Sequence, residues 1–262
     1  MADRLDVTLR LVRNAGRASL ADLAARLGVS EMTVRRDLDV LQARGLVERV
    51  RGGALAVAGP ENGFAARAGW QAGLKERIGR VAAARVEPGA TVLLDAGTTT
   101  VHVARALADR AAAGEGPFTA AVVSLPVADA LADRPGVRLL VVGGEARPGE
   151  RSLAGPLTAT VLRQLTFDLF VMSIGAVSAA AGWSEFTLED AAVKQVGLQQ
   201  ARSTLVVADA SKLGVRAFAS VAPLDAVGRL VTDASARDPQ LTPAAQDTLA
   251  ALDDAGVEVD CT

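Results

Sequence analysis

Apolar residues recur every three to four positions in the first part of the chain, which predicts short helices. One stripe runs from Leu5 to Val12 and stops at Gly16, a residue typical of helix ends. A second stripe follows Ser19, a serine suited to an N-cap, and stops at Gly28. The pattern therefore predicts two helices in the first 28 residues.

A third helix is predicted directly after the short turn at Gly28. Ser30 is its expected N-cap, and Val34, Leu38 and Leu41 form its inward stripe. The side chains left mostly off the core are Thr33, Arg35, Arg36, Asp39 and Gln42. Two short helices joined by a tight turn predict a helix-turn-helix, whose later helix enters a major groove.

The stretch "GLVERVRGGALAV" contains two short apolar runs around a Gly-Gly pair. It predicts a β-hairpin, since Gly52 and Gly53 can supply the positive φ angles that a tight turn requires. Arg49 and Arg51 then lie beside or at the tip. Three helices followed by such a hairpin form a winged helix.

The exposed polar residues of this first module suit a nucleic-acid surface. A guanidinium group can bond guanine or clamp a phosphate, and a threonine can reach a phosphate or a thymine methyl. The alternative is a solvated helix face on which Arg35 and Arg36 pair with Asp39 and Glu31. The predicted DNA-binding residues are Ser30, Thr33, Arg35, Arg36, Arg49, Arg51, Gly52 and Gly53.

From Gly73 onward, continuous apolar runs alternate with helical patterns. The predicted strands are 91–95, 120–124, 137–143, 167–173, 203–209 and 228–233, and helical spacing occurs over 98–109, 156–165 and 188–202. Buried strands separated by helices predict an α/β domain with a mostly parallel sheet and helices on both faces. The expected organisation is a winged helix over 1–57, a connection over 58–72 and an α/β domain over 73–262.

Polar residues follow the predicted strands, and sites in parallel sheets lie at these strand exits. "DAGTTT" (95–100) places a glycine and three threonines before a helix, where free N–H groups and hydroxyls suit a phosphate. The alternative is a turn with a threonine cap. Other exits carry Ser124, Gly143, Gly144 and Asp209.

Lysine is rare in this chain, because only 3 of its 28 cations are lysines. Lys212 follows a strand exit, and Lys194 lies about one helical turn after Glu189 and Asp190. An ammonium group can reach a phosphate or sugar oxygen, and carboxylates can accept from sugar hydroxyls. The alternative pairs Lys194 with Asp190 on a surface helix.

Charge divides the chain as the hydrophobic pattern does. Residues 1–57 hold ten arginines against seven acids, whereas the remainder holds eighteen basic residues against twenty-three acids. The start of the chain does not resemble a secretory signal, and the longest uncharged run, 169–184, is broken by glycines, so we expect a cytoplasmic protein without a membrane span. Cys261 is the only cysteine, and neither a disulfide, a metal nor a cofactor is expected.

Several motifs resemble a known family. Residues 4–54 contain "VSEMTVRRDLDVLQARGLVERVRGGA", which resembles the N-terminal domain of the DeoR family of bacterial transcriptional regulators, with Arg51 where the family usually has histidine. "DAGTTT", "SLP", "VGGE", "LAGP", "EDAAVK" and "ADASKLG" are similar, in order, to the family's C-terminal sensor domain. That domain is similar in fold to ribose-5-phosphate isomerase and binds phosphorylated sugars or related metabolites.

The resemblance implies an effector pocket at the strand exits. The implied residues are Asp95, Gly97, Thr98, Thr99, Thr100, Ser124, Gly143, Gly144, Glu189, Lys194, Asp209 and Lys212. Residues 174–187 depart from the family pattern, and Trp183, Glu185 and Phe186 are expected at the variable end of the ligand. There Glu185 would repel a second anion, and the aromatic rings could stack on a sugar or base.

These observations together predict a DNA-binding transcriptional regulator, a repressor of carbohydrate or related metabolic genes. Its expected partners are double-stranded operator DNA and a small-molecule effector, a phosphorylated sugar, and it is expected to form a homodimer or homotetramer with no membrane partner. Two alternatives stay open: an enzyme of the sugar-phosphate isomerase type, and a DNA-binding protein that needs no ligand.

Overall fold

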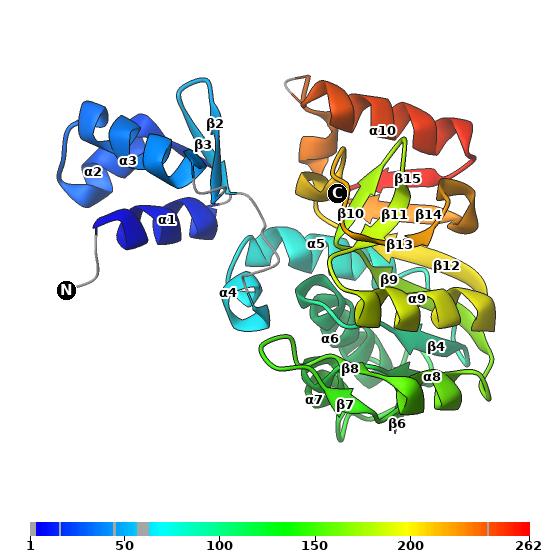
Figure 1. Cartoon of the computed structure of the whole chain (residues 1–262). Coiled ribbons are helices and arrows are strands. Elements are labelled where there is room, and N and C mark those ends of the chain that lie inside the picture. Colours follow the sequence, from blue (N-terminus) through cyan, green and yellow to red (C-terminus); the bar gives the residue numbers. More distant parts are fainter. Residues whose placement is uncertain (1–3, 16, 44–45, 57–62, 240) are drawn as a thin grey trace. The chain divides into compact units, whose positions relative to one another are not determined.

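The computed structural model describes residues 4–15, 17–43, 46–56, 63–239 and 241–262. The chain divides into two compact units, Met1–Ala72 and Gly73–Thr262 (Figure 1). Of the segment assigned to a connection, 58–62 lies outside the described residues, and α4 (Phe64–Ala68) occupies part of the rest.

The first unit is a winged helix, as the hydrophobic pattern predicts. Its elements are α1 (Arg4–Ala15), β1 (Arg17–Ser19), α2 (Leu20–Leu27), α3 (Glu31–Ala43), β2 (Val47–Val50) and β3 (Gly53–Ala56). β2 and β3 form an antiparallel hairpin, and β1 adds to its other side in the order β1-β3-β2. Ser19 caps α2 by accepting from the Asp22 N–H at 3.0 Å, and Gly28 ends α2 with φ +65°.

The predicted inward stripe of α3 forms the centre of this unit. Val34 and Leu38 are fully buried, and Leu41 is nearly so. They pack in one cluster with Leu23 of α2 and with Trp70, which follows α4. Burial of this stripe fixes which side of α3 faces outward.

The two glycines of the wing have different roles. Gly52 lies in the turn with φ +86°, as predicted, but Gly53 is the first residue of β3 and does not adopt a positive φ. A Cβ atom at Gly53 would lie 2.1 Å from the carbonyl oxygen of Ala18. The prediction that both glycines supply turn angles is therefore wrong for Gly53, which is needed for the close approach of β1.

The second unit is built on a seven-stranded parallel sheet in the order β15-β14-β12-β9-β4-β5-β6 (Figure 1). The strands are β4 (Thr91–Leu94), β5 (Phe118–Val122), β6 (Val137–Val141), β9 (Phe167–Ser173), β12 (Ala201–Val207), β14 (Arg229–Thr232) and β15 (Glu258–Cys261). Every predicted strand is present, and β15 is an additional one. The sheet confirms the predicted α/β class.

Helices cover the sheet on both faces. They are α5 (Ala72–Ala83), α6 (Thr98–Ala112), α7 (Leu125–Leu131), α8 (Pro156–Leu162), α9 (Leu188–Gln200) and α10 (Pro243–Asp254). From β4 the chain continues through β5 to β6 at one edge of the sheet, whereas from β9 it continues through β12 and β14 toward β15 at the opposite edge. Because such crossovers are right-handed, α6 and α7 lie on the opposite face from α9.

A smaller antiparallel sheet, which the hydrophobic pattern did not predict, packs on α9. It consists of β10 (Ala176–Ser178), β11 (Gly182–Glu185) and β13 (Ala219–Ala222) in the order β10-β11-β13. A short hairpin, β7 (Glu145–Ala146) and β8 (Leu153–Ala154), follows β6. Both additions bring polar side chains toward the carboxyl ends of the main strands. Every helix in the described part of the chain is too short or too polar to cross a membrane.

Candidate functional site

The outer face of α3 carries the predicted recognition residues. Arg35 and Arg36 are exposed, and neither side chain has an ion pair or hydrogen bond among the described residues. The Ser30 hydroxyl accepts from the Thr33 N–H at 3.2 Å and lies 3.0 Å from the Thr33 hydroxyl. Ser30 and Thr33 thus begin the helix, while the two arginines remain available to a ligand.

Two acidic residues of α3, Asp37 and Asp39, are paired with arginines from other elements. The Arg4 guanidinium donates two hydrogen bonds to the buried carboxylate of Asp37, at 2.7 and 2.9 Å. This fork ties α1 to α3, and no periodicity in the sequence signals it. Asp39 pairs with Arg49 of β2 rather than with Arg35, so the alternative of an Arg35–Asp39 pair on a solvated face is wrong.

The wing presents one of its two predicted arginines freely. Arg51 is exposed in the turn beside Gly52. Arg49, in contrast, donates to Asp39 and also to the main-chain oxygen of Arg35, the latter at 3.1 Å. Of the two wing arginines that the sequence predicts to bind DNA, Arg51 is therefore free to do so, whereas Arg49 is bonded within the protein.

In the second unit, a buried cluster of charges joins three predicted pocket residues. The Lys194 ammonium lies 2.8 Å from the Asp95 carboxylate and 3.1 Å from the Glu185 carboxylate. Asp95 follows β4, Glu185 ends β11 and Lys194 lies on α9. The three side chains are 2, 9 and 3% exposed for Asp95, Glu185 and Lys194, so the cluster is shielded from bulk water.

Main-chain and hydroxyl donors complete the coordination of these carboxylates. Asp95 accepts from the N–H of Ala96 at 2.8 Å and from the N–H of Ser173 at 3.0 Å. Glu185 accepts from the N–H of Gly175 at 2.9 Å. Sequence reasoning missed Ser173, although its place at the carboxyl end of β9 follows the same strand-exit rule that singled out Ser124.

Burial shifts the protonation equilibria of the cluster. Removal from water raises the pKa of both Asp95 and Glu185, and the charge of Lys194, which acts to lower both pKa values, does not outweigh it. Burial acts to lower the pKa of Lys194, but the Asp95 and Glu185 charges outweigh it, and that pKa is raised. Lys194 therefore remains charged, and its charge is already neutralised within the protein.

A second polar layer surrounds Asp190, one turn before Lys194. Asp190 pairs with Arg147, which follows β7, and accepts from the Thr187 hydroxyl at 3.0 Å. Burial acts to raise the pKa of Asp190, but the charges of Lys194 and Arg147 outweigh it and the pKa is lowered. The alternative of a Lys194–Asp190 pair on a surface helix is wrong, because Lys194 is buried against other partners. Nothing in the sequence pattern signalled Arg147.

The predicted phosphate loop places buried hydroxyls at the start of α6. Gly97 has φ +145°, and a Cβ there would lie 2.8 Å from the Ser173 hydroxyl, so only glycine fits. Thr98, Thr99 and Thr100 form the first turn of α6 and are buried. The hydroxyls of Thr100 and Ser124 are both buried without a hydrogen-bond partner among the described residues. A buried hydroxyl without a partner can be satisfied by a water molecule or by another polar group.

Three other predicted pocket residues, Gly143, Gly144 and Asp209, have different surroundings. Gly143 and Gly144 both adopt positive φ, and the Gly143 carbonyl accepts from the Thr158 hydroxyl at 2.8 Å. Asp209 caps the short helix Ala210–Lys212 by accepting from the Ser211 N–H at 3.1 Å.

Lys212 and Glu189 lie outside the buried charge cluster. Lys212 is half-buried and has no ion pair among the described residues. Glu189 is exposed, and none of the cluster contacts involves it.

Trp183 is a core residue. Its side chain has no exposed surface, and its indole N–H donates to the carbonyl of Leu224 at 3.2 Å. The expectation that Trp183 stacks on a ligand is therefore wrong. Phe186 is half-buried beside Gly175.

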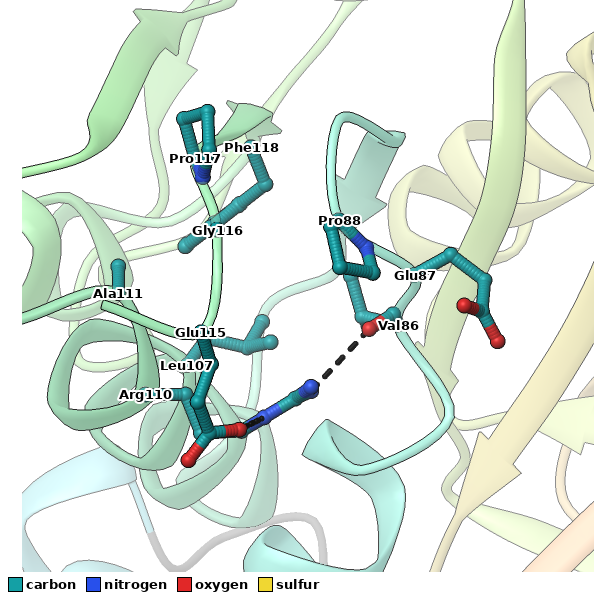
Figure 2. A pocket seen from close by; sticks show the side chains of 10 residues that line it. All are labelled: Val86, Glu87, Pro88, Leu107, Arg110, Ala111, Glu115, Gly116, Pro117 and Phe118. Carbon is teal, nitrogen blue, oxygen red and sulfur yellow. Dashed lines mark hydrogen bonds and ion pairs between the residues drawn. The ribbon is translucent and has the colours of Figure 1, made fainter. Parts of the chain in front are cut away.

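A hollow lies at the opposite, amino end of the strands (Figure 2). It lies between the segment before β4 and the start of β5, and Figure 2 shows the Arg110 side chain reaching into it. Arg110 donates to the Glu115 carboxylate at 2.7 Å and to the Val86 carbonyl at 3.1 Å. Because these polar groups already bond to one another, they are not free to bind a ligand in the hollow. Among the described ranges, no group of three or more His, Cys, Asp or Glu side chains could hold a metal ion.

A winged helix with free arginines on its recognition helix, followed by an α/β unit with polar strand ends, defines the class of DNA-binding transcriptional regulators that carry a sensor domain. The chain belongs to the DeoR family of that class. Residues 4–58 match the model of the DeoR-like helix-turn-helix domain, and residues 70–234 match that of the DeoR C terminal sensor domain.

Several regulators of this family match the chain over nearly their whole length. The transcriptional repressor AccR of Agrobacterium fabrum is 32% identical over 238 residues, 90% of each chain. The HTH-type transcriptional regulator GlpR of Haloferax volcanii is 30% identical and covers 88% of this chain and 89% of its own. The glycerol-3-phosphate regulon repressor of Escherichia coli is 29% identical, covering 86% of this chain and 88% of its own.

Similar solved structures are more distant. Ribose 5-phosphate isomerase A from Methanocaldococcus jannaschii covers 54% of each chain at 15% identity, with a TM-score of 0.40. The sorbitol operon regulator SorC from Klebsiella pneumoniae covers 80% of this chain and 90% of its own at 14% identity, with a TM-score of 0.32. At these TM-scores neither likeness bears on function.

Proposed function

We propose that this protein is a transcriptional repressor that binds operator DNA and is released from it by a phosphorylated carbohydrate or a related metabolite. The observation that carries the proposal is the exposure of Arg35 and Arg36 on the outer face of α3, whose opposite face is anchored in the core. Both side chains are free to bond base edges or phosphates in a major groove. Relatives whose names specify repressors, among them that of the glycerol-3-phosphate regulon, support repression and a phosphorylated effector.

The proposed effector site lies at the carboxyl ends of β4, β5 and β12. The N–H groups at the start of α6, with the hydroxyls of Thr100 and Ser124, would hold a phosphate. Lys212 would supply the cation, since the charge of Lys194 is already balanced by Asp95 and Glu185. The remaining polar groups at the strand ends would bind hydroxyl groups of the sugar.

Release from DNA would follow from linkage between the two sites. An effector that binds more tightly to the arrangement unable to bind DNA draws the population away from the operator. A helix-turn-helix protein reads paired half-sites as a symmetric oligomer, so we propose a homodimer or homotetramer on half-sites spaced by about 10 bp or a multiple of it.

An isomerase-like enzyme is the weaker candidate. Acid–base catalysis needs a titratable group that can reach a substrate proton. Of the candidate groups Asp95, Glu189 and Lys194, Asp95 and Lys194 are buried and paired with each other, and Glu189 is exposed outside that pair. We therefore expect the purified protein to leave ribose 5-phosphate unchanged, and measurable turnover would favour the enzyme.

The proposal can be tested with the purified full-length chain. The protein would first select a duplex from a random-sequence pool, and the complex would then be titrated with phosphorylated and free sugars while bound DNA is followed by gel shift. We expect a specific duplex to be enriched and at least one phosphorylated sugar to release it. Failure to enrich any sequence would contradict DNA recognition, and a complex indifferent to every metabolite, with an unchanged melting temperature, would favour the ligand-independent alternative.

A further inference from the structure

Arg49 joins the wing to the recognition helix. Its side chain leaves β2, and one guanidinium nitrogen donates both to the Asp39 carboxylate and to the main-chain oxygen of Arg35, at 3.1 Å for the latter. Because residues 35 and 39 are one turn apart on α3, the guanidinium group lies along that turn. The side chain of Arg49 is 21% exposed, while that of Asp39 is 62% exposed.

The charge of Asp39 has a consequence for DNA binding. A carboxylate on the same helix face as Arg35 would repel phosphates as the helix approached a groove. The ion pair with Arg49 neutralises it. Arg35, Arg36 and Arg51 have no such partner among the described residues, so they can supply the positive charge.

We propose that Arg49 is a positioning residue, which fixes the wing against the recognition helix and cancels the charge of Asp39, and that it does not itself contact DNA. The inference rests on the proposed function and assigns the phosphate and base contacts to Arg35, Arg36 and Arg51. Arg49 and Arg51 lie on the same short hairpin, but the proposal gives them different roles because Arg49 is bonded to α3 and Arg51 is exposed.

The salt dependence of DNA binding distinguishes a residue that contacts a phosphate from one that only positions other residues. Each phosphate contact contributes about 0.9 to the slope of the logarithm of affinity against the logarithm of salt concentration. A residue that contacts a phosphate therefore changes the slope when it is removed, whereas one that only positions other groups lowers affinity with the slope unchanged.

The experiment uses the full-length protein and the duplex that the wild type selects from a random-sequence pool. Binding is measured over a range of salt concentrations for Arg49→Ala, Asp39→Asn, the double variant, and Arg51→Ala as the matched wing control. We expect Arg49→Ala to weaken binding by about tenfold. The slope is compared in the Asp39→Asn background, where no free carboxylate contributes, and the double variant should have the same slope as Asp39→Asn. The double variant should regain part of that loss, because no unpaired carboxylate remains, although the bond from Arg49 to the Arg35 main-chain oxygen is still missing. Arg51→Ala should lower the slope.

Two results of the binding measurements would overturn the proposal. One is a slope for the double variant that lies as far below that of Asp39→Asn as the slope of Arg51→Ala lies below that of the wild type, and the other is a double variant that binds no better than Arg49→Ala. Melting temperatures of the wild type, Arg49→Ala, Asp39→Asn and the double variant give a reading independent of DNA, since the effects of the two substitutions should be non-additive if the residues are coupled. If the wild type enriches no duplex, the proposed function fails, while additive melting temperatures would still reject the Arg49–Asp39 coupling.

Discussion

The ammonium group of Lys194 lies 2.8 Å from the carboxylate of Asp95, and both side chains are at least 97% buried. The two residues come from elements far apart in the chain, the exit of β4 and the middle of α9. Glu185 shares the same ammonium group at 3.1 Å. One cation thus holds two carboxylates at the carboxyl ends of the parallel strands, and this arrangement has measurable consequences for stability.

Loss of the Lys194 charge should destabilise the second unit strongly. Lys194→Met leaves Asp95 and Glu185 buried without a counter-charge, and removing one partner of a buried ion pair costs about 3–5 kcal/mol. Urea denaturation would measure the free energy of unfolding. Lys212→Met is the matched control and should change stability by less than about 1 kcal/mol, because Lys212 is half-buried and unpaired among the described residues. Equal effects of the two substitutions would contradict the role assigned to the cluster.

Asp190 should contribute a stabilisation that acid removes. Its pKa lies below the ordinary value of 3.8, so the folded state binds the proton less tightly than the unfolded state. The contribution is present above that ordinary value and is lost as the pH falls through the lowered pKa. The difference in unfolding free energy between wild type and Asp190→Asn should therefore shrink as acid is added. Arg147→Ala, which removes one cause of the shift, should reduce this pH dependence. A difference that stays constant from about pH 6 to about pH 3 would argue against it.

The two wing glycines should respond differently to alanine. Gly53→Ala places a methyl group against the Ala18 carbonyl, where an ideal Cβ would be 2.1 Å away, so β1 must move away from the wing. We expect a loss of about 1–3 kcal/mol and a matching loss of DNA affinity. Gly52→Ala meets no atom within 4 Å and costs only the strain of its positive φ, about 1 kcal/mol. Thermal melting of both variants checks that Gly53→Ala destabilises the protein more than Gly52→Ala does. A greater loss of stability for Gly52→Ala would refute the prediction.

Arg35 and Arg36 should carry the DNA contacts. Each alanine substitution should weaken operator binding, by about 1–3 kcal/mol for a bidentate base contact and less for a phosphate contact. Neither should alter the melting temperature of the free protein, because neither side chain has a partner among the described residues. A double variant that shifts the operator at wild-type protein concentrations would rule out α3 as the recognition helix.

The sequence pattern was most informative where burial is continuous. The stretches 92–94 and 169–172 are apolar because a central parallel strand is covered on both faces, and they lie within β4 and β9. The short strands Ala176–Ser178 and Ala219–Ala222 escaped prediction because they consist of small residues without a period of two. Their pairing depends on tertiary contacts.

The sequence predicts where the site lies but not which of its side chains bond to one another. Strand exits located Asp95 and Ser124, since that rule depends only on topology. The partners of Lys194 could not be found from spacing, because local spacing pointed to Asp190, whereas the fold brings Asp95 and Glu185 to the ammonium group. Trp183 was misjudged for a similar reason: its burial depends on the small antiparallel sheet, which was not foreseen.

The central claim is that a phosphorylated metabolite bound at the strand ends releases this protein from DNA. Effector titrations of the protein–operator complex test it most directly, with phosphorylated sugars and the matching free sugars added to wild type and to Lys212→Ala. We predict that a phosphorylated sugar releases the wild type, that its free counterpart does not, and that Lys212→Ala binds the operator normally but resists release at the same concentration. Release of Lys212→Ala at the wild-type concentration, or equal potency of the free and phosphorylated sugars, would contradict a phosphate site formed by Gly97 to Thr100 and Lys212.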